Sequence, residues 1–155
     1  MKEVVELLRE KNLTISTMES CTGGGLVNSI TNIEGASDIL KFSAVTYSNE
    51  FKIKMGVNKS IIDKYSVYSM ETANEMSKNI SLFTGSDIGV GITGKLNRAD
   101  KNNLYGDDNK IFVSIYLKET NEYKNFIYTA TKNTRSENKE LIIQNIAEEI
   151  KKIIQ

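Results

Sequence analysis

Residues 13–31 read LTISTMESCTGGGLVNSIT, and this segment is the strongest indication of the fold in the sequence. Its opening residues include several β-branched side chains, which favours a strand over 13–18. A helix is expected over 22–32, with Gly23 to Gly25 in its first turn. A strand, a glycine-rich turn and a helix aim backbone N–H groups and the positive end of the helix dipole at one point. That point can bind a phosphate, or the oxyanion of an acyl-transfer reaction.

The remainder of the chain alternates helical and extended patterns. Apolar residues at helical spacing, with capping residues and glycines at the ends, predict helices over 2–11, 49–55, 61–64, 70–84 and 135–154. Alternating or glycine-rich apolar runs predict strands over 42–47, 87–93, 110–117 and 123–131. We see no repeat or linker, so we expect one domain over residues 1–155. Its class should be α/β: a three-layer α/β/α sandwich with a mixed sheet.

Three local predictions accompany these elements. Ser60 is expected to cap the short helix that follows it, and Thr134 with Glu137 forms a capping box for the last helix. The polar segment over 94–109 is long for a structureless connection, so it is expected to be a functional lid or a disordered loop. The buried stripe of the helix over 70–84 should consist of Ala73, Met76, Ile80 and Phe83.

The composition removes several kinds of chemistry. The chain has no histidine and a single cysteine, Cys21. It therefore cannot build a Ser-His-Asp or Cys-His unit, an imidazole-rich or thiolate-rich zinc site, or an intrachain disulfide. A carboxylate-bound magnesium ion stays open. Acid–base chemistry near neutral pH must use Lys, Tyr, Asp, Glu or Cys with a shifted pKa.

The charge is balanced, with 20 basic and 20 acidic residues. A balanced charge gives no global attraction to nucleic acid or to an anionic membrane. No apolar run is long enough to span a bilayer, and the amphipathic N-terminus does not resemble a signal peptide. We therefore expect a cytoplasmic protein that has neither a nucleic acid nor a membrane as a direct partner.

Two candidate nucleophiles stand at the entrance of the glycine-rich turn. Ser20 can attack a carbonyl carbon if a base activates it, and the alternative is a capping or turn residue. Cys21 can do so if the helix N-terminus lowers its thiol pKa, and the alternative is a small packed residue. For Gly23 and Gly24, the alternatives are an anion cradle or tight packing of the helix against the sheet.

Three further segments are candidates for the same site. Tyr47 and Lys52 come just after the strand over 42–47, where ligands gather in open α/β sheets. A lysine kept neutral there can deprotonate a serine, whereas most lysines are solvated. Arg135 suits a phosphate, or is a surface arginine beside a capping box. An anion cradle or a tight turn can be formed by the run Gly91-Ile92-Thr93-Gly94.

These segments, in this order, resemble the CinA C-terminal domain family, whose stand-alone members are nicotinamide-nucleotide amidohydrolases. The resemblance covers essentially the whole chain, and its first two motifs are specific. The motifs that carry it are Glu19-Ser20-Cys21-Thr22-Gly23-Gly24, Val45-Thr46-Tyr47-Ser48-Asn49-Glu50-Phe51-Lys52, Gly56-Val57, the helix start from Tyr68-Ser69 to Glu71, and Gly91-Ile92-Thr93-Gly94.

The resemblance implies hydrolysis of the carboxamide of nicotinamide mononucleotide to nicotinic acid mononucleotide and ammonia, without a metal or a cofactor. It makes Ser20 the nucleophile, Lys52 its general base and Tyr47 a hydrogen-bonding assistant. The partner would be this small-molecule nucleotide, and the protein a homodimer or larger homo-oligomer. The residues that the resemblance assigns to the oxyanion and the substrate are Cys21, Thr22, Gly23, Gly24, Gly91, Thr93, Gly94 and Arg135.

Two segments depart from the family pattern. Many members have Gly-Ile-Ala-Gly-Pro followed by glycines, whereas here Gly94 is followed by Lys95, Leu96, Asn97 and Arg98. The family's Gly-Asp-Arg is Asn133-Thr134-Arg135 in this chain. The changes bear on the substrate rather than on the fold. They motivate a second hypothesis, a non-catalytic nucleotide-binding or regulatory module, and Cys21 motivates a third, a thiol-dependent hydrolase.

Overall fold

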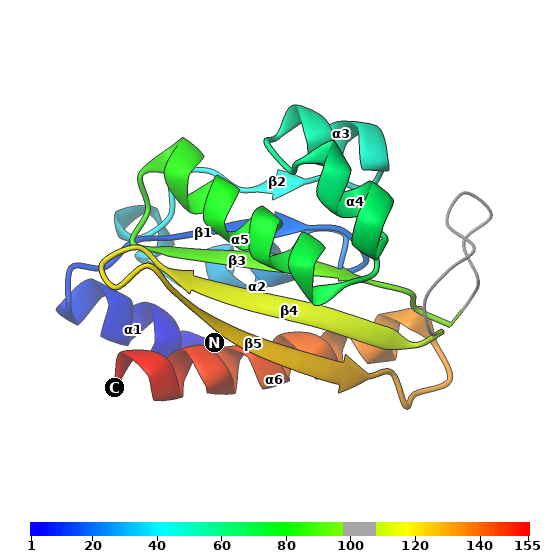
Figure 1. Cartoon of the computed structure of the whole chain (residues 1–155). Helices are drawn as coiled ribbons and strands as arrows, with labels where there is room; N and C mark the ends of the chain where they lie inside the picture. The colour runs from blue at the N-terminus through cyan, green and yellow to red at the C-terminus, as the bar shows by residue number, and fades with distance from the viewer. Residues whose placement is uncertain (98–107) are drawn as a thin grey trace.

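The computed structural model describes residues 1–97 and 108–155, which form a mixed sheet with helices on both faces (Figure 1). Its strand order is β2-β1-β3-β4-β5. β1 runs parallel to both β2 and β3, whereas β3, β4 and β5 pair antiparallel in succession. The strands are β1 (Ile15–Glu19), β2 (Ala44–Val45), β3 (Ile88–Gly94), β4 (Lys110–Leu117) and β5 (Glu122–Thr129).

Two helical layers enclose the sheet (Figure 1). On one face, α5 (Met70–Thr84) lies across β1, β3 and β4, with α3 (Asn49–Lys54) and α4 (Lys59–Tyr65) beside it. On the other face, α1 (Lys2–Glu10) and α2 (Gly25–Thr31) pack against α6 (Arg135–Ile154), and a short 3-10 helix, η1 (Ala36–Asp38), precedes β2. The three-layer α/β/α sandwich and the mixed sheet that the sequence predicts are confirmed.

The strongest periodic patterns predict their elements residue for residue. α5, β4 and α6 have the predicted bounds 70–84, 110–117 and 135–154. Thr134 caps α6, because its hydroxyl accepts a hydrogen bond from the Glu137 N–H at 3.2 Å. The predicted lid or disordered loop over 94–109 lies largely outside the described residues.

Two boundaries near the glycine-rich turn differ from the predicted ones. β2 has two residues rather than the predicted six, because it pairs with β1 only through Ala44 and Val45. α2 begins at Gly25 rather than at residue 22. Gly23 and Gly24 adopt φ of 61° and 92°, which is left-handed backbone outside a right-handed helix.

Two side-chain predictions are also wrong. Asn58, not Ser60, caps α4, since its side chain accepts the Ser60 N–H at 3.0 Å. Phe83 is 66% exposed rather than buried, and its ring lies 5.4 Å from that of Phe42, so it packs on a neighbouring loop instead of the sheet. The other predicted members of the α5 stripe, Ala73, Met76 and Ile80, are buried.

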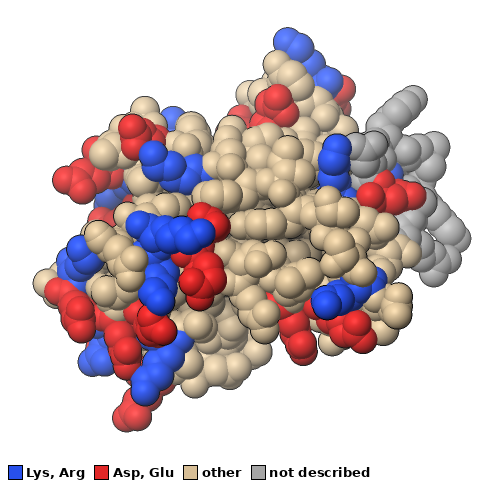
Figure 2. All heavy atoms as spheres, turned by 90° about the horizontal axis from the view of Figure 1, so that it is seen from below, with Lys and Arg blue, Asp and Glu red and all other residues tan. Residues whose placement is uncertain are grey.

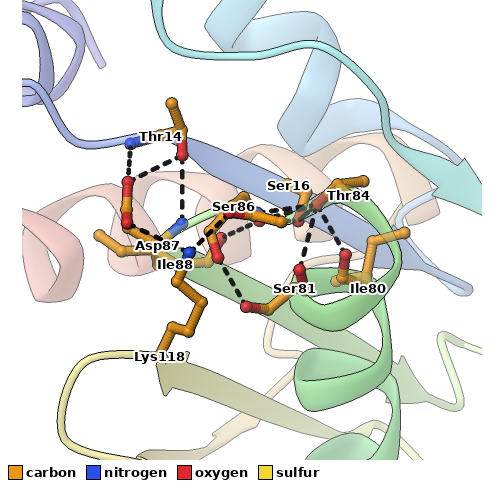
Figure 3. Close-up of polar contacts among 10 residues, drawn as sticks. Thr14, Ser16, Ile80, Ser81, Thr84, Ser86, Asp87, Ile88 and Lys118 are labelled. Atoms are coloured by element: carbon orange, nitrogen blue, oxygen red, sulfur yellow. Dashed lines mark hydrogen bonds and ion pairs between the residues drawn. The ribbon is translucent and has the colours of Figure 1, made fainter.

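At the amino ends of β1 and β3, a network of hydroxyl groups joins the strands to the end of α5 (Figure 3). The hydroxyls of Ser16 and Ser86 lie 2.5 Å apart, and that of Thr84 lies 2.9 Å from Ser86. One oxygen of the Asp87 carboxylate accepts from both the backbone N–H and the hydroxyl of Thr14, at 2.9 and 2.8 Å. The protein thus satisfies the polar groups at this end of the sheet by itself.

The surface carries charges of both signs. Figure 2 shows Lys and Arg side chains interspersed with Asp and Glu on the face that it presents. Lys151 of α6 and Glu3 of α1 form an ion pair between the two outer helices. Among the residues that the structure describes, no helix combines the length and the hydropathy needed to cross a membrane.

Candidate active site

The candidate site lies where β1 and β2 end, beside β3. In the sheet, β2 lies on one side of β1 and β3 lies on the other side. The connections that follow β1 and β2 therefore run to opposite sides of β1. Ligands of open α/β sheets bind at such points. Backbone hydrogen bonds join the segments, from Ser20 N to Ile92 O at 3.1 Å and from Thr46 N to Glu19 O at 2.8 Å. The residues that follow these strands therefore meet at one place.

Ser20 and Lys52 are in direct contact, although 32 residues separate them in the sequence. Lys52 Nζ donates hydrogen bonds to Ser20 Oγ at 3.0 Å and to the Thr46 carbonyl at 2.7 Å. Only 2% of Lys52 and 7% of Ser20 are exposed. Burial disfavours the charged form of an amine, and the carbonyl fixes the direction of the nitrogen. The geometry is that of a serine nucleophile with an adjacent base.

The local sequence of α3 explains why Lys52 points inward. Ser48 caps this helix by accepting the Phe51 N–H at 3.2 Å, and the cap sets the helix rotation. Lys52 is the residue of α3 that is buried, whereas Phe51 is 53% exposed. A surface helix normally buries its phenylalanine and exposes its lysine. The inverted arrangement points to a functional role for Lys52.

The turn from Ser20 to Gly25 leaves several backbone N–H groups without an acceptor. Gly23 N donates to Ser20 O at 2.9 Å, and Gly25 N donates to Thr22 O at 3.0 Å. Within the described chain, the N–H groups of Cys21, Thr22 and Gly24 donate to no oxygen atom, and that of Cys21 contacts only its own sulfur. N–H groups without an acceptor beside a nucleophile are what an oxyanion requires.

Glu19 has a role that the sequence analysis missed. Its carboxylate is fully buried beneath the start of α2. Oε1 accepts from the Leu26 N–H and Oε2 from the Val27 N–H, each at 2.9 Å. A helix N-terminus attracts an anion, and here that anion belongs to the protein. An acidic residue at the end of a buried strand, a few residues before a helix, was the signal that could have identified it.

Cys21 lies beside Ser20 but is not suited to be the nucleophile. It is 3% exposed. Burial raises the pKa of its thiol to about 12, which outweighs the opposite effect of the nearby Lys52. The expectation of a lowered thiol pKa is therefore wrong, because burial dominates, and the nearby Glu19 carboxylate raises this pKa further. A protonated, buried thiol is a poor nucleophile.

Tyr47 and Arg135 are in contact with each other, and the charge of Arg135 also acts on the Cys21 thiol beside Ser20. Arg135, at the start of α6, donates to the Tyr47 hydroxyl at 3.2 Å and to the Leu96 carbonyl. Tyr47 is 64% exposed. In the described part of the chain, the Tyr47 hydroxyl makes no hydrogen bond to Ser20 or Lys52. Lys139 lies near the turn, with Nζ 3.3 Å from where a Cβ of Gly23 would be.

The run from Gly91 to Gly94 lies under the site as part of β3. A Cβ at Gly91 would be 2.3 Å from the Ala73 carbonyl of α5, so this glycine permits close contact between helix and strand. A Cβ at Gly94 would be 2.5 Å from the Lys110 carbonyl of β4. The Thr93 hydroxyl donates to Val67 O at 2.9 Å. These residues contact the fold itself, and substrate contacts from them stay a prediction.

The model of one protein family, the CinA C-terminal domain, matches residues 1–154 of this chain. A putative competence-damage inducible protein from Caldanaerobacter subterraneus is 46% identical over 92 residues, which is 59% of this chain and 22% of the relative. A protein of the same name from Clostridium beijerinckii is 40% identical over 116 residues, or 74% of this chain and 28% of the relative. The match therefore spans less than a third of these relatives.

Solved structures have the same fold at low sequence identity. A CinA superfamily protein from Klebsiella pneumoniae superposes with a TM-score of 0.90 at 17% identity, covering 99% of this chain and 94% of the other. The competence/damage inducible protein CihA from Agrobacterium tumefaciens gives a TM-score of 0.86 at 20% identity, covering 99% and 95%. The agreement over nearly the whole of both chains establishes the fold.

Proposed function

The chain belongs to the CinA C-terminal domain family, and we propose that it is an amidohydrolase that converts nicotinamide mononucleotide to nicotinic acid mononucleotide and ammonia. The observation that carries this proposal is the contact between Ser20 and Lys52. A buried lysine whose nitrogen lies 3.0 Å from a serine oxygen is within proton-transfer distance. The absence of histidine from the sequence is consistent with a serine–lysine pair.

The reaction would begin with proton transfer from the Ser20 hydroxyl to neutral Lys52. Ser20 Oγ attacks the carboxamide carbon, and the carbonyl oxygen becomes an oxyanion. The unpaired N–H groups of Cys21, Thr22 and Gly24 are the available donors for it, and one such donor is worth about 2.7–4 kcal/mol. Protonated Lys52 then gives its proton to the leaving nitrogen, which departs as ammonia.

The second half of the reaction would use water. Neutral Lys52 takes a proton from a water molecule, which attacks the ester formed on Ser20 and releases the carboxylic acid product. The bond between Ser20 Oγ and the acyl carbon breaks, and Lys52 returns the proton to Ser20 Oγ, which regenerates the enzyme. Arg135 and Lys139, at the first turns of α6, supply positive charge for the substrate phosphate. No step requires a metal ion.

The test is an amidase assay of the purified, chelator-treated protein with nicotinamide mononucleotide, in which ammonia and the acid product are both measured. We expect turnover in the unmodified protein and none with Ser20→Ala. Unchanged activity in Ser20→Ala would exclude the proposed nucleophile. Binding of the nucleotide, seen as a raised melting temperature, without any turnover would favour the alternative of a non-catalytic nucleotide-binding or regulatory module.

A further inference from the structure

The buried carboxylate of Glu19 is saturated with hydrogen bonds. Besides the two N–H groups of α2, it accepts from two hydroxyls: that of Thr22 on Oε1 at 2.6 Å and that of Thr17 on Oε2 at 3.1 Å. Four donors match the four lone pairs of an ionised carboxylate. Two of these donors belong to α2, one to the glycine-rich turn and one to β1. Glu19 therefore connects the nucleophile's turn to the elements on both sides of it.

This arrangement changes where a substrate anion can bind. The first N–H groups of a helix have no intrahelical acceptor and form its anion-binding end. In α2, those of Leu26 and Val27 are taken by Glu19. The helix terminus is therefore not a site for a phosphate or an oxyanion. The donors left over are those of the turn that precedes the helix.

A complete account of the turn's backbone donors supports this conclusion. From Ser20 to Val27, three N–H groups donate to backbone carbonyls and two donate to Glu19. The remaining three, on Cys21, Thr22 and Gly24, have no oxygen acceptor in the described chain, and that of Cys21 contacts only its own sulfur. The Thr22 side chain is held by Glu19 while its N–H stays unpaired. Glu19 thus holds Thr22, which lies between Cys21 and Gly24, the other two residues with N–H groups that are available to a ligand.

We propose that Glu19 is a positioning residue: through Thr22 and the start of α2 it holds the turn so that the N–H groups of Cys21, Thr22 and Gly24 face the oxygen of the carbonyl group whose carbon Ser20 attacks. This inference rests on the proposed amidohydrolase function for its catalytic meaning. The geometry of the turn itself does not depend on that function. In the described chain the Glu19 carboxylate makes no hydrogen bond to Ser20 Oγ, and it acts through the residues it binds.

A purely structural role for Glu19 makes a different prediction. If the carboxylate only joined β1 to α2, the loss of any one hydroxyl donor would weaken the fold and leave the turn unaltered. Thr17 and Thr22 allow the two roles to be separated, because both are buried threonines that donate to Glu19. Only Thr22 lies on the turn, and valine is nearly isosteric with threonine.

The experiment compares Thr22→Val with its matched control, Thr17→Val, and with Glu19→Gln. We measure kcat and KM for nicotinamide mononucleotide, the melting temperature, and the rate at which a chromogenic disulfide reagent reacts with the thiol of Cys21. That thiol is the only one in the chain and is buried in the turn. Its reaction rate therefore reports how well the turn is held, whatever the protein catalyses.

We expect Thr22→Val to lower kcat about tenfold with KM nearly unchanged, and Glu19→Gln to lower it on the order of 10²-fold, because small misplacements of catalytic groups have effects of this size. Both should expose Cys21, with a thiol reaction at least about tenfold faster. Thr17→Val should leave kcat and the thiol rate within about threefold of the original values.

Equal effects of Thr22→Val and Thr17→Val on the thiol rate would overturn the proposal, as would an unchanged thiol rate in Thr22→Val. If Glu19→Gln does not fold, the threonine pair decides alone. A failure of the proposed function is seen separately, as an unmodified protein that does not hydrolyse the nucleotide. In that case a fast thiol reaction in Thr22→Val still shows that Glu19 positions the turn.

Discussion

The two ends of β1 and β3 differ in how their polar groups are satisfied. At the amino ends, hydroxyls and the Asp87 carboxylate bond to one another and to the backbone (Figure 3). At the carboxyl ends, three N–H groups of the turn have no oxygen acceptor, and the Thr46 hydroxyl is buried without a partner in the described chain. Two other buried side-chain atoms without partners, on Asn74 and Tyr128, lie elsewhere in the fold.

One end of the sheet therefore stabilises the fold, and the other end carries the candidate site. A satisfied polar network stabilises the fold, because each buried donor or acceptor left alone costs about 1–3 kcal/mol. Unsatisfied groups gathered around a buried lysine lower stability unless a ligand pairs with them. Proteins break local rules of this kind mainly at functional sites. Substitutions at the carboxyl ends should therefore affect activity, and those at the amino ends should affect stability.

The largest effect is expected at the carboxyl end from Lys52→Met. Loss of a general base should lower kcat by about 10²–10⁴-fold. The melting temperature should be unchanged or higher, because a buried amine is replaced by an apolar side chain of similar length. The matched control is Lys54→Met on the same helix, whose lysine is exposed, and it should retain activity. A large loss of stability in Lys52→Met would show that the lysine is structural.

Gly91 lies within β3, between the two ends of the strand. The variant Gly91→Ala tests whether this residue serves the fold or the site. The new Cβ would lie 2.3 Å from the Ala73 carbonyl and 2.6 Å from the Ser77 nitrogen. We expect the free energy of unfolding to fall by about 1–3 kcal/mol, the usual cost of overpacking. The KM of the protein that remains folded should not change. A raised KM at an unaltered melting temperature would instead place Gly91 in contact with the substrate.

A smaller effect is expected at the amino end from Asp87→Asn. Burial raises the pKa of Asp87, but the hydrogen bonds from Thr14 and the charge of Lys118 outweigh it and hold this pKa below its ordinary value of 3.8. The native state thus gains stability from the ionised group above about pH 4, and loses it as pH falls through the lowered pKa.

The substitution should cost about 1 kcal/mol at neutral pH, discounted for partial exposure, and leave kcat unchanged. Denaturant unfolding of both proteins between pH 7 and pH 3 measures the difference, which we expect to shrink toward the acid end. A difference that stays constant with pH would mean that the charge of Asp87 does not contribute.

The smallest effect on activity is expected from Cys21→Ala. The buried, protonated thiol has no chemical role in the proposed reaction, so kcat should stay within about threefold of the original value. Ser20→Ala, one residue away, is the matched comparison and should be inactive. An inactive but folded Cys21→Ala with an active Ser20→Ala would support the thiol-dependent hydrolase in place of the serine enzyme.

The sequence predicts most of the fold because its strongest patterns are local. Caps and apolar periodicity define α5 and α6, and a run of apolar and β-branched residues defines β4. The predicted length of β2 is too great, because the number of its residues that pair with β1 depends on tertiary structure. Phe83 was misplaced because helical periodicity does not show where the sheet ends beneath a helix.

The site is less predictable from residue patterns, since it depends on long-range contacts. The pairing of Lys52 with Ser20 was expected through the family resemblance, and the inward direction of Lys52 contradicts the usual behaviour of lysine. The position of Glu19 between a buried strand and a helix is a local signal for its contact with the helix N-terminus, but its hydrogen bonds to Thr17 and Thr22 follow from the folded turn. The hydroxyl of Tyr47 accepts a hydrogen bond from Arg135, and the assistance of Tyr47 in the reaction stays a prediction of the family resemblance.

In the proposed mechanism, Lys52 makes Ser20 a reactive nucleophile. The most direct test is treatment with a serine-directed fluorophosphonate, followed by intact mass measurement and localisation of the adduct. We predict a single adduct on Ser20 in the unmodified protein, and none on Ser20 in Lys52→Met under the same conditions. An unmodified protein without an adduct, or equal labelling of Ser20 in both proteins, would contradict the account.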